Sequence, residues 1–401
     1  MAENKEKKVL NVPNLRFPEF EGEWEEHYLS DYLDFKNGLN PKPERFGKGI
    51  KFISVMDILN NAVITNDCIR ASVDVSEEEL LSFCVENGDI LFQRSSETLE
   101  DVGRANVYMD NKPAVFGGFV IRGKKKAEYD PLFFRYLLAS PFARKKIIPM
   151  GAGAQHFNIG QEGLNKVKLH FALLDEQKKI ARLLSLLDER IATQNKIIEK
   201  LESLIKGISN RLLYADNSMS IRIEEMLIER SERTKKNNQY EILSSTVNGI
   251  FSQRDYFSKD IASDNNVGYK IIHLHDIVLS PQNLWMGNIN FNDKFDIGIV
   301  SPSYKVFSIA DGFDKKYVAA LLKTHHALYN YMLVSEQGAS IVRRNLNYEA
   351  FEQLVFKIPS LNKQQEIGHV ISLLKSQLEN ANLLIKTYNS QKQYLLRQMF
   401  I

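Results

Sequence analysis

The chain repeats its own sequence, and this repeat restricts the fold more than any other feature does. Residues 169–180 resemble residues 356–367, which lie 187 positions later. Residues 88–91 and 275–278 are related by the same offset, although it falls to 184 for part of the segment between them because of a short insertion or deletion. The chain is therefore a tandem duplication in which each half is a globular segment followed by a long helical segment.

Both helical segments carry the pattern of a coiled coil. From Ile180 onward, apolar residues recur at alternating spacings of four and three, with Gln194 in the one gap. The corresponding positions after Ile367 keep this register, with Lys392 as the exception. Such heptads predict helices about 50 Å long at 1.5 Å per residue. An amphipathic helix often lies on its own globular core, but the length and the shared register favour an antiparallel pair of helices.

The globular segments have the patterns of a mixed α and β fold. Short apolar runs beside glycine-containing turns predict strands at 50–55, 89–92, 114–116 and 119–121. Helical spacing predicts helices that begin at Pro131 and after Asp314.

A chain of 401 residues is too long for one ordinary core, so two or three domains are expected. We predict two tandem α/β domains, 1–173 and 215–360, which are separated by two long antiparallel coiled-coil helices at 174–214 and 361–401 in a pseudo-two-fold repeat.

Composition narrows the class of protein. The 52 Lys and Arg residues nearly balance the 50 Asp and Glu residues, so a nucleic-acid surface would have to be a local patch. Two cysteines, Cys68 and Cys84, cannot build a disulfide framework and indicate a reducing compartment. No apolar run reaches the ~18 residues of a membrane span, and the first residues lack an apolar signal core. We therefore expect a soluble cytoplasmic protein without a membrane partner.

Patterns that carry catalysis are missing from the sequence. The loop 151–156 begins like a dinucleotide-binding loop but has His156 where the third glycine belongs, and no P-loop occurs. Ser203 and Lys206 have Ser-x-x-Lys spacing but lie within the heptad seam. His273 and His275 have no nearby cysteine and no third ligand, so no metal site is predicted. The sequence therefore predicts a chain that is not an enzyme and holds no cofactor of its own.

Basic, glycine-flanked loops occupy matching places in the two halves. The loop 151–156 aligns with 338–344, and the two loops have different tips. Because arginine can be bidentate to guanine and glutamine to adenine, such loops could read two different DNA sequences. A single Lys or Arg is more often a solvated surface charge, so the paired placement carries this prediction. The candidate DNA contacts are Lys42, Arg94, Arg104, Gln155 and His156 in the first half and Arg254, Arg343 and Arg344 in the second.

These features together resemble a known family. The segment 13–20 with Trp24, the strand at 88–91, the loop 151–156 and the helix start at 173–180 are similar to the DNA specificity subunit of bacterial type I restriction-modification systems. The resemblance implies two target-recognition domains that read the halves of a bipartite, asymmetric site in double-stranded DNA, with the paired helices as a ruler between them.

The resemblance also implies partners. Two methyltransferase subunits would dock on the helices, and two motor-nuclease subunits would join them for restriction. Methylation of adenine N6 would use S-adenosylmethionine held by the methyltransferase subunit, so this chain would need no cofactor. The helix positions expected to dock partners are Ile180, Leu187, Ile198, Leu374 and Ile385.

The second half departs from the pattern of the first. It has no copy of the opening segment 15–18, so no first strand is assigned to it, and 362–364 replaces the acidic 175–177.

The function predicted is a non-catalytic DNA specificity subunit. One alternative is a coiled-coil adaptor that recruits proteins without recognising DNA, which failure to bind any duplex beside the methyltransferase subunit would favour. Another is an enzyme that acts alone, which is the weakest because no catalytic set of residues is found.

Overall fold

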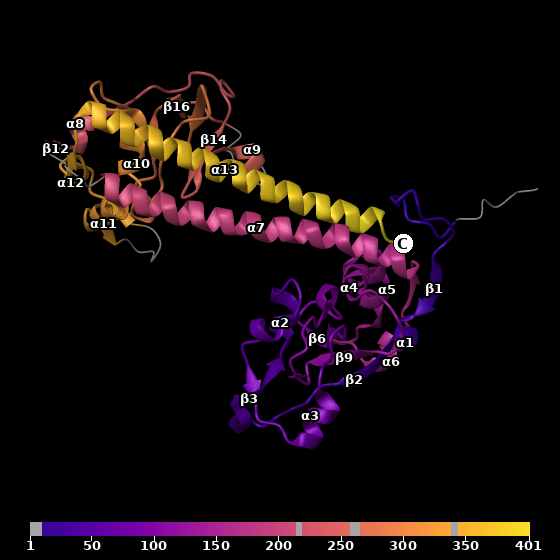
Figure 1. Cartoon of the computed structure of the whole chain (residues 1–401). Coiled ribbons are helices and arrows are strands. Elements are labelled where there is room, and N and C mark those ends of the chain that lie inside the picture. Colours follow the sequence, from indigo (N-terminus) through magenta and orange to yellow (C-terminus); the bar gives the residue numbers. More distant parts are fainter. Residues whose placement is uncertain (1–9, 214–218, 257–264, 338–343) are drawn as a thin grey trace, which may run out of the picture. The chain divides into compact units, whose positions relative to one another are not determined.

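The structure, a computed structural model, describes residues 10–213, 219–256, 265–337 and 344–401 (Figure 1). The chain forms two compact units. Unit 1 contains residues 1–195 together with 383–401, and unit 2 contains residues 196–382. The two long helices are α7 (Leu174–Leu213) and α13 (Leu361–Gln398). Each of them contributes one end to each unit, whereas the sequence-based division had placed both helices outside the globular domains.

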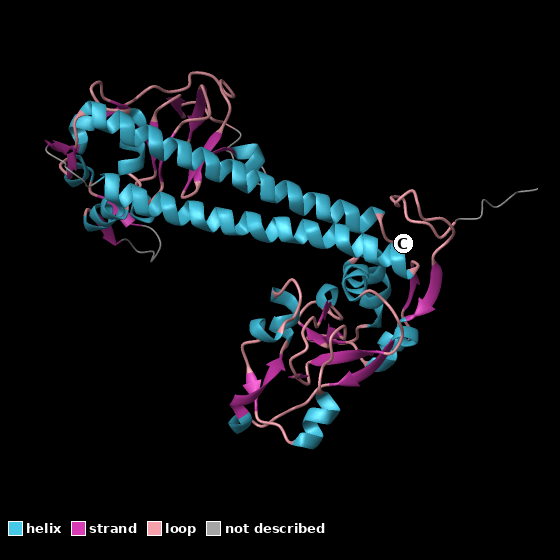
Figure 2. Ribbon diagram, viewed as in Figure 1, coloured by secondary structure: helices cyan, strands magenta, loops and turns pink. Residues whose placement is uncertain are grey.

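Unit 1 is built around a four-stranded antiparallel sheet (Figure 2). Its strand order is β2 (Leu33–Asn37), β9 (Val120–Lys125), β5 (Ile90–Gln93) and β7 (Ala105–Val107). A second sheet has the order β4 (Ser72–Val73), β3 (Phe46–Ile53) and β8 (Ala114–Phe116). Two strand pairs complete the unit, namely β1 (Glu25–Tyr28) with β11 (Lys168–Phe171) and β6 (Ser95–Ser96) with β10 (Phe157–Asn158).

Unit 2 repeats the central sheet of unit 1. Its strand order is β13 (Leu227–Glu229), β20 (Lys305–Ile309), β17 (Ile277–Leu279) and β18 (Ile289–Phe291). The remaining strands pair as β12 (Met219–Arg222) with β23 (Val355–Ile358), β14 (Leu243–Thr246) with β15 (Gly249–Ser252), β16 (Lys270–His273) with β19 (Ile297–Val300), and β21 (Ser335–Gln337) with β22 (Arg344–Leu346).

Short helices cover these sheets in both units. Those of unit 1 are α1 (Leu29–Tyr32), α2 (Val55–Asn60), α3 (Glu77–Phe83), α4 (Pro131–Ala139), α5 (Pro141–Ile147) and α6 (Gln161–Asn165). Those of unit 2 are α8 (Ile223–Met226), α9 (Gln253–Tyr256), α10 (Lys315–Leu321), α11 (His325–Leu333) and α12 (Tyr348–Glu352).

The first strand of unit 2 is present, although the absence of a second opening segment had left it in doubt. β12 pairs with β23 directly before α13, just as β1 pairs with β11 directly before α7. Among the described residues of the second half, no ion pair corresponds to the one between Arg16 and Glu176. Arg16 makes two hydrogen bonds of 2.8 Å to the buried carboxylate of Glu176, and the exposed Lys363 stands at the matching position of α13. The opening segment and the acidic helix start are therefore missing together because they bind each other.

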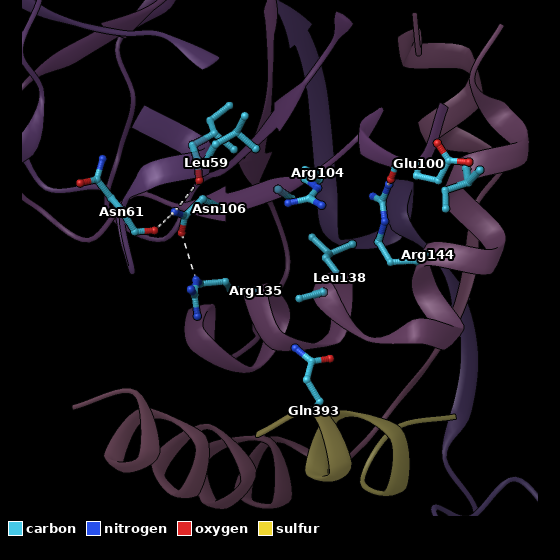
Figure 3. A pocket seen from close by; sticks show the side chains of 13 residues that line it. Leu59, Asn61, Glu100, Arg104, Asn106, Arg135, Leu138, Arg144 and Gln393 are labelled. Carbon is cyan, nitrogen blue, oxygen red and sulfur yellow. Dashed lines mark hydrogen bonds between the residues drawn. The ribbon is translucent and has the colours of Figure 1, made fainter. Parts of the chain in front are cut away.

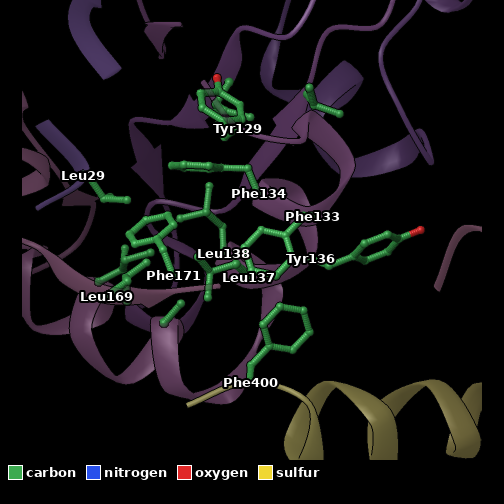
Figure 4. Packing of buried hydrophobic residues seen from close by; sticks show 14 of the residues in the cluster. Leu29, Tyr129, Phe133, Phe134, Tyr136, Leu137, Leu138, Leu169, Phe171 and Phe400 are labelled. Carbon is green, nitrogen blue, oxygen red and sulfur yellow. The ribbon is translucent and has the colours of Figure 1, made fainter. Parts of the chain in front are cut away.

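The core of unit 1 joins the two ends of the chain (Figure 4). Phe400, which follows α13, is 1% exposed, and its ring centroid lies 5.5 Å from that of Phe133 in α4 and 6.2 Å from that of Trp24. The backbone N–H of Leu15 also donates to the carbonyl of Gln398, at 2.9 Å. The C-terminal residues therefore complete the hydrophobic core of the N-terminal unit.

Within unit 1 the two long helices pack antiparallel. The early α7 residues Ile180 and Leu184 share one core with the late α13 residues Leu395 and Met399. Lys392, the exception in the heptad pattern, donates to Asp188 of α7 at 2.5 Å. The positive charge of Lys392 within the seam is therefore neutralised by a carboxylate of the other helix. Without such a partner, a charge in this position would be unfavourable.

A buried glutamine fastens the start of α7 to the domain beside it. The Oε1 atom of Gln177 accepts from the backbone N–H of Asp130 at 3.0 Å, and its Nε2 donates to the carbonyl of Ala172 at 2.8 Å. Asp130 caps the N-terminus of α4 by accepting from the N–H of Phe133. One side chain that is 3% exposed thus ties α4, the end of β11 and α7 together.

Unit 2 has the same clamp. Gln364 accepts from the backbone N–H of Asp314 at 3.1 Å and donates to the carbonyl of Pro359 at 2.9 Å. Asp314 caps α10 as Asp130 caps α4. Gly368 allows this close approach, because a Cβ atom there would lie 2.3 Å from the Asp314 carboxylate.

Substituting Gln364→Ala tests the clamp. The change leaves two buried backbone groups without partners, so we expect a loss of about 1–3 kcal/mol of stability. Hydrogen exchange should show faster opening of α10 in unit 2, with α4 of unit 1 unchanged. The neighbouring Gln365 is exposed, and Gln365→Ala should stay within about 0.5 kcal/mol of wild type. Equal effects of the two substitutions would contradict the clamp.

Candidate nucleic-acid interface

Several loops of unit 1 meet where β5 ends. The backbone N–H of Arg94 donates to the carbonyl of Phe119 at 2.9 Å, and its guanidinium donates to the carbonyl of Gly118 at 3.3 Å. The carbonyl of Arg94 accepts from the N–H of Ile159 at 2.9 Å. Arg94 is half-buried, so it joins the turn before β9 to the loop before α6 while part of its guanidinium stays accessible.

Gln155 and His156 lie on an exposed loop beside Arg94. Ala152 and Asn158 pair at the base of this loop, and Asn158 also hydrogen-bonds Ser95. Both candidate side chains are exposed. The structure therefore brings Arg94, Gln155 and His156 together at one edge of unit 1, although the residues are about 60 positions apart.

Lys42 lies on a third loop, directly before the short 3-10 helix Pro43–Arg45. Its side chain is exposed, and no ion pair or hydrogen bond to it occurs among the described residues. The other cations of this loop have partners: Arg45 binds the carboxylate of Glu79, and Lys48 pairs with Asp74 at 3.0 Å. Of the basic residues in this loop, Lys42 is therefore the one available to a phosphate.

Arg104 lies at a different place from the other candidates of unit 1. It lines a cavity of about 400 Å³ together with Arg135, Arg144 and Glu100 (Figure 3). Its guanidinium pairs with Asp101 at 2.6 Å and is about half exposed. Arg94, Gln155 and His156 do not line this cavity.

The other two arginines of this cavity are held by the protein itself. Arg135 donates to Asn106 at 3.1 Å and pairs with Asp188 at 3.3 Å. Arg144 donates to the carbonyls of Glu100 and Val102, and burial, followed by the charge of Arg104, lowers the pKa of Arg144 to about 10. Asp101 pairs with Arg104 and Asp188 pairs with Arg135, while backbone carbonyls hold Arg144, so all three arginines are engaged by groups of the protein itself.

Two of the three candidate DNA contacts of unit 2 lie within the described residues. Arg343 lies outside the described residues, whereas Arg344 begins β22. The Arg344 guanidinium lies 4.7 Å from the centroid of the Trp285 ring, and its backbone N–H donates to the carbonyl of Gln282. Arg254 is exposed in α9. Arg344 is therefore a partly covered side chain, whereas Arg254 is an exposed one.

Two buried carboxylates at matching positions support these loops. Asp89 accepts from the backbone N–H groups of Glu86 and Lys125, and Asp276 accepts from that of His273 and from the Arg230 guanidinium. Burial raises the pKa of both Asp89 and Asp276. Because their oxygens are used to fix the starts of β5 and β17, these acids have a structural role.

The five helix positions predicted to dock partners differ in how deeply they are buried. Ile180 is 1% exposed and Leu187 is 6% exposed, and both belong to the core of unit 1. Their assignment as partner contacts is therefore wrong, because side chains of this chain already cover them. Ile198, Leu374 and Ile385 are half-buried, so their docking role stays a prediction.

Sequence reasoning missed an exposed aromatic side chain among the unit 1 loops. Phe119 is 68% exposed at the turn between β8 and β9, and Met56 nearby is 60% exposed. The signal was present in Gly117 and Gly118, which were interpreted as a simple turn. Large apolar groups that stand in solvent beside basic loops are typical of binding surfaces.

Metal sites and membrane-spanning helices are two further features to consider in the described part of the chain. Its His, Cys, Asp and Glu side chains form no group of three that could hold a metal ion. Across the same residues, no helix combines the length and the apolar character needed to cross a bilayer.

The sequence is similar to specificity proteins of type I restriction systems. Residues 21–203 match the family model of the type I restriction modification DNA specificity domain. The candidate type I restriction enzyme MjaX specificity subunit of Methanocaldococcus jannaschii is 28% identical over 210 residues, which are 51% of this chain and 49% of that protein. The EcoKI specificity subunit of Escherichia coli is 24% identical over 188 residues, 46% of this chain and 39% of that protein. The chain thus spans about half the length, or less, of these curated relatives. Residues 21–203 of this chain are therefore similar to the DNA specificity domain of type I restriction-modification systems.

The fold matches this family over nearly the whole chain. The crystal structure of the type I restriction-modification S subunit from M. genitalium has a TM-score of 0.61 at 15% identity, with 97% of this chain and 99% of that chain covered. A solved chain of another type I R-M system has a TM-score of 0.53 at 11% identity, with 94% and 97% covered. The likeness in fold therefore includes unit 2, of which the family model covers only residues 196–203.

Substituting Gly153→Ala tests how the exposed loop of unit 1 is built. Gly153 has a φ of +143°, and a Cβ atom there would lie 1.9 Å from the carbonyl oxygen of His156. We expect about 1–3 kcal/mol of local strain, seen as faster proteolysis within 152–158 without loss of the unit 1 core. Gly160→Ala is the control, because a Cβ atom at Gly160 meets nothing within 4 Å. Identical protease sensitivity of the two variants would contradict this role of Gly153.

Proposed function

We propose that this chain is the DNA specificity subunit of a type I restriction-modification complex and that each unit reads one half of a bipartite, asymmetric site. One observation carries the proposal. The two units have the same central strand order, and loops at matching places in their sequences have different tips. A repeated scaffold with unlike tips suits two half-sites of unlike sequence.

The accessible polar tips supply the reading groups of unit 1. Gln155 and His156 are exposed and carry donors and acceptors that can pair with base edges. Arg94 lies beside them and can reach either a guanine or a phosphate, while Lys42 is suited to a phosphate because it is a flexible point charge. Arg104 is set apart by its ion pair with Asp101 and is a weaker candidate.

In unit 2 the equivalent roles fall to Arg343 and Arg344, with Arg254 as a phosphate contact. Arg344 stacks on Trp285, which fixes the plane of its guanidinium and would lower the entropy lost when it binds a base. The near-balance of charge over the whole chain agrees with DNA contact through such local groups.

The long helices offer the surface for protein partners. Apolar side chains stand exposed along both of them, including Leu204 at 46% in α7 and Leu373 at 52% in α13. With Ile198, Leu374 and Ile385 beside them, these residues would dock two methyltransferase subunits, and two motor-nuclease subunits would join the complex for restriction. S-adenosylmethionine would be held by the methyltransferase subunits, so this chain would position the DNA and carry out no chemistry itself.

The alternative of a coiled-coil adaptor without DNA recognition is not supported, because the matched family model is that of a DNA specificity domain.

The proposal predicts a pattern of methylated adenines that depends on this chain. DNA from cells that express the chain with its methyltransferase subunit should carry N6-methyladenine in a two-part motif, as read by single-molecule sequencing. Cells that express the methyltransferase subunit alone are the control and should lack that motif. Identical maps from the two strains would refute the proposal for that pair of proteins.

A further inference from the structure

An apolar pocket opens among the unit 1 loops, and no role has yet been given to it. The pocket has a volume of about 490 Å³. Its apolar wall contains Phe46, Phe52, Met56 and Phe119, and its polar wall contains Asn40 and Ser95. A polar strip beside an aromatic wall is typical of sites that orient a flat, partly apolar ligand.

Three glycines allow the walls of this pocket to approach each other. A Cβ atom on Gly118 would lie 1.9 Å from the Asn40 side chain, and one on Gly117 would lie 2.7 Å from the Phe52 ring. A Cβ atom on Gly38 would lie 2.1 Å from the backbone of Gly117. Gly38 therefore permits a close approach of two backbone segments, and Gly117 and Gly118 leave room for the Phe52 ring and the Asn40 side chain.

The rim of the pocket favours an anionic occupant. Lys42 follows Pro41 of the lining, and Arg94 holds the Phe119 turn through the carbonyl of Gly118. Phe119 nevertheless stands 68% exposed, so its ring is presented to a partner and not buried in the core. Apolar surface beside free cations matches a DNA groove, in which base edges carry methyl groups and phosphates flank them.

The side-chain amide of Asn40 indicates which base pair the pocket could bind. Asn40 is exposed, and its side chain forms no hydrogen bond within the described residues. A carboxamide can pair with N6 and N7 of adenine, while an apolar surface can contact the 5-methyl group of the paired thymine. A G·C pair offers no methyl group in the major groove, so it leaves the apolar wall without a partner.

We propose that this pocket reads an A·T pair in the half-site of unit 1, with the thymine 5-methyl group against Phe119 and Met56 and the adenine edge toward Asn40. The proposal rests on the proposed function, because it requires unit 1 to bind DNA. It names specificity-determining residues of unit 1 outside the loop that carries Gln155 and His156.

The test removes the proposed methyl contact first from the DNA and then from the protein. Duplexes that carry the mapped motif are prepared with each thymine of the unit 1 half-site replaced singly by uracil, which lacks the 5-methyl group. Their affinities are measured by fluorescence anisotropy with the full chain in complex with its methyltransferase subunits. We expect uracil to weaken binding about fourfold at one position, the value of one buried methyl-sized group. With Phe119→Ala, thymine and uracil should bind equally at that position.

Phe142→Ala is the matched control, because Phe142 is an exposed phenylalanine of α5 that does not line the pocket. It should keep the fourfold preference for thymine. The inference is overturned if wild type shows no uracil effect, if the half-site contains no A·T pair, or if Phe119→Ala keeps the preference. Should the wild-type complex bind no duplex at all, the proposed function fails too, whereas motif binding without a uracil effect removes the inference alone.

Discussion

The buried glutamine at the start of each long helix is the contact on which the architecture depends. Gln177 and Gln364 each satisfy two backbone groups that would otherwise be buried without partners, and both bonds reach the same places in their units. Each clamp joins the cap of one short helix to the final strand of its sheet and to the long helix. The loops that follow the central strands are therefore fixed relative to a rigid helix within each unit, which preorganises the groups offered to a ligand.

The two units share what is buried and differ in what is exposed. The clamps, the carboxylates of Asp89 and Asp276 and the order of the central strands recur in both. The loop tips do not recur: unit 1 presents Gln155 and His156, whereas unit 2 begins β22 with Arg344 over Trp285. Recognition of an asymmetric site requires two similar units with different loops, because a symmetric protein would favour a palindrome. A duplicated fold that keeps its buried contacts and changes its loop residues meets this requirement.

The sequence predicted the repeat, the two helices and four strands of unit 1, namely β3, β5, β8 and β9, because each leaves a local pattern. Contacts between residues far apart in sequence left no such pattern. Lys392 looked like a defect in the heptads until Asp188 was found across the seam, and Ile180 looked like a docking residue although it is buried within unit 1. The pocket beside Phe119 depends on four separate segments, so Gly117 and Gly118 could be interpreted only as a turn.

A map of methylated adenines can show whether each unit reads its own half of the DNA site. Methylated adenines are mapped in cells that carry the methyltransferase subunit with either the wild-type chain or a chain in which Gln155 and His156, both exposed, are replaced by alanine. The account predicts that one half of the motif becomes degenerate while the other half and the spacer stay as in wild type. Equal relaxation of both halves, or no change in either, would contradict it.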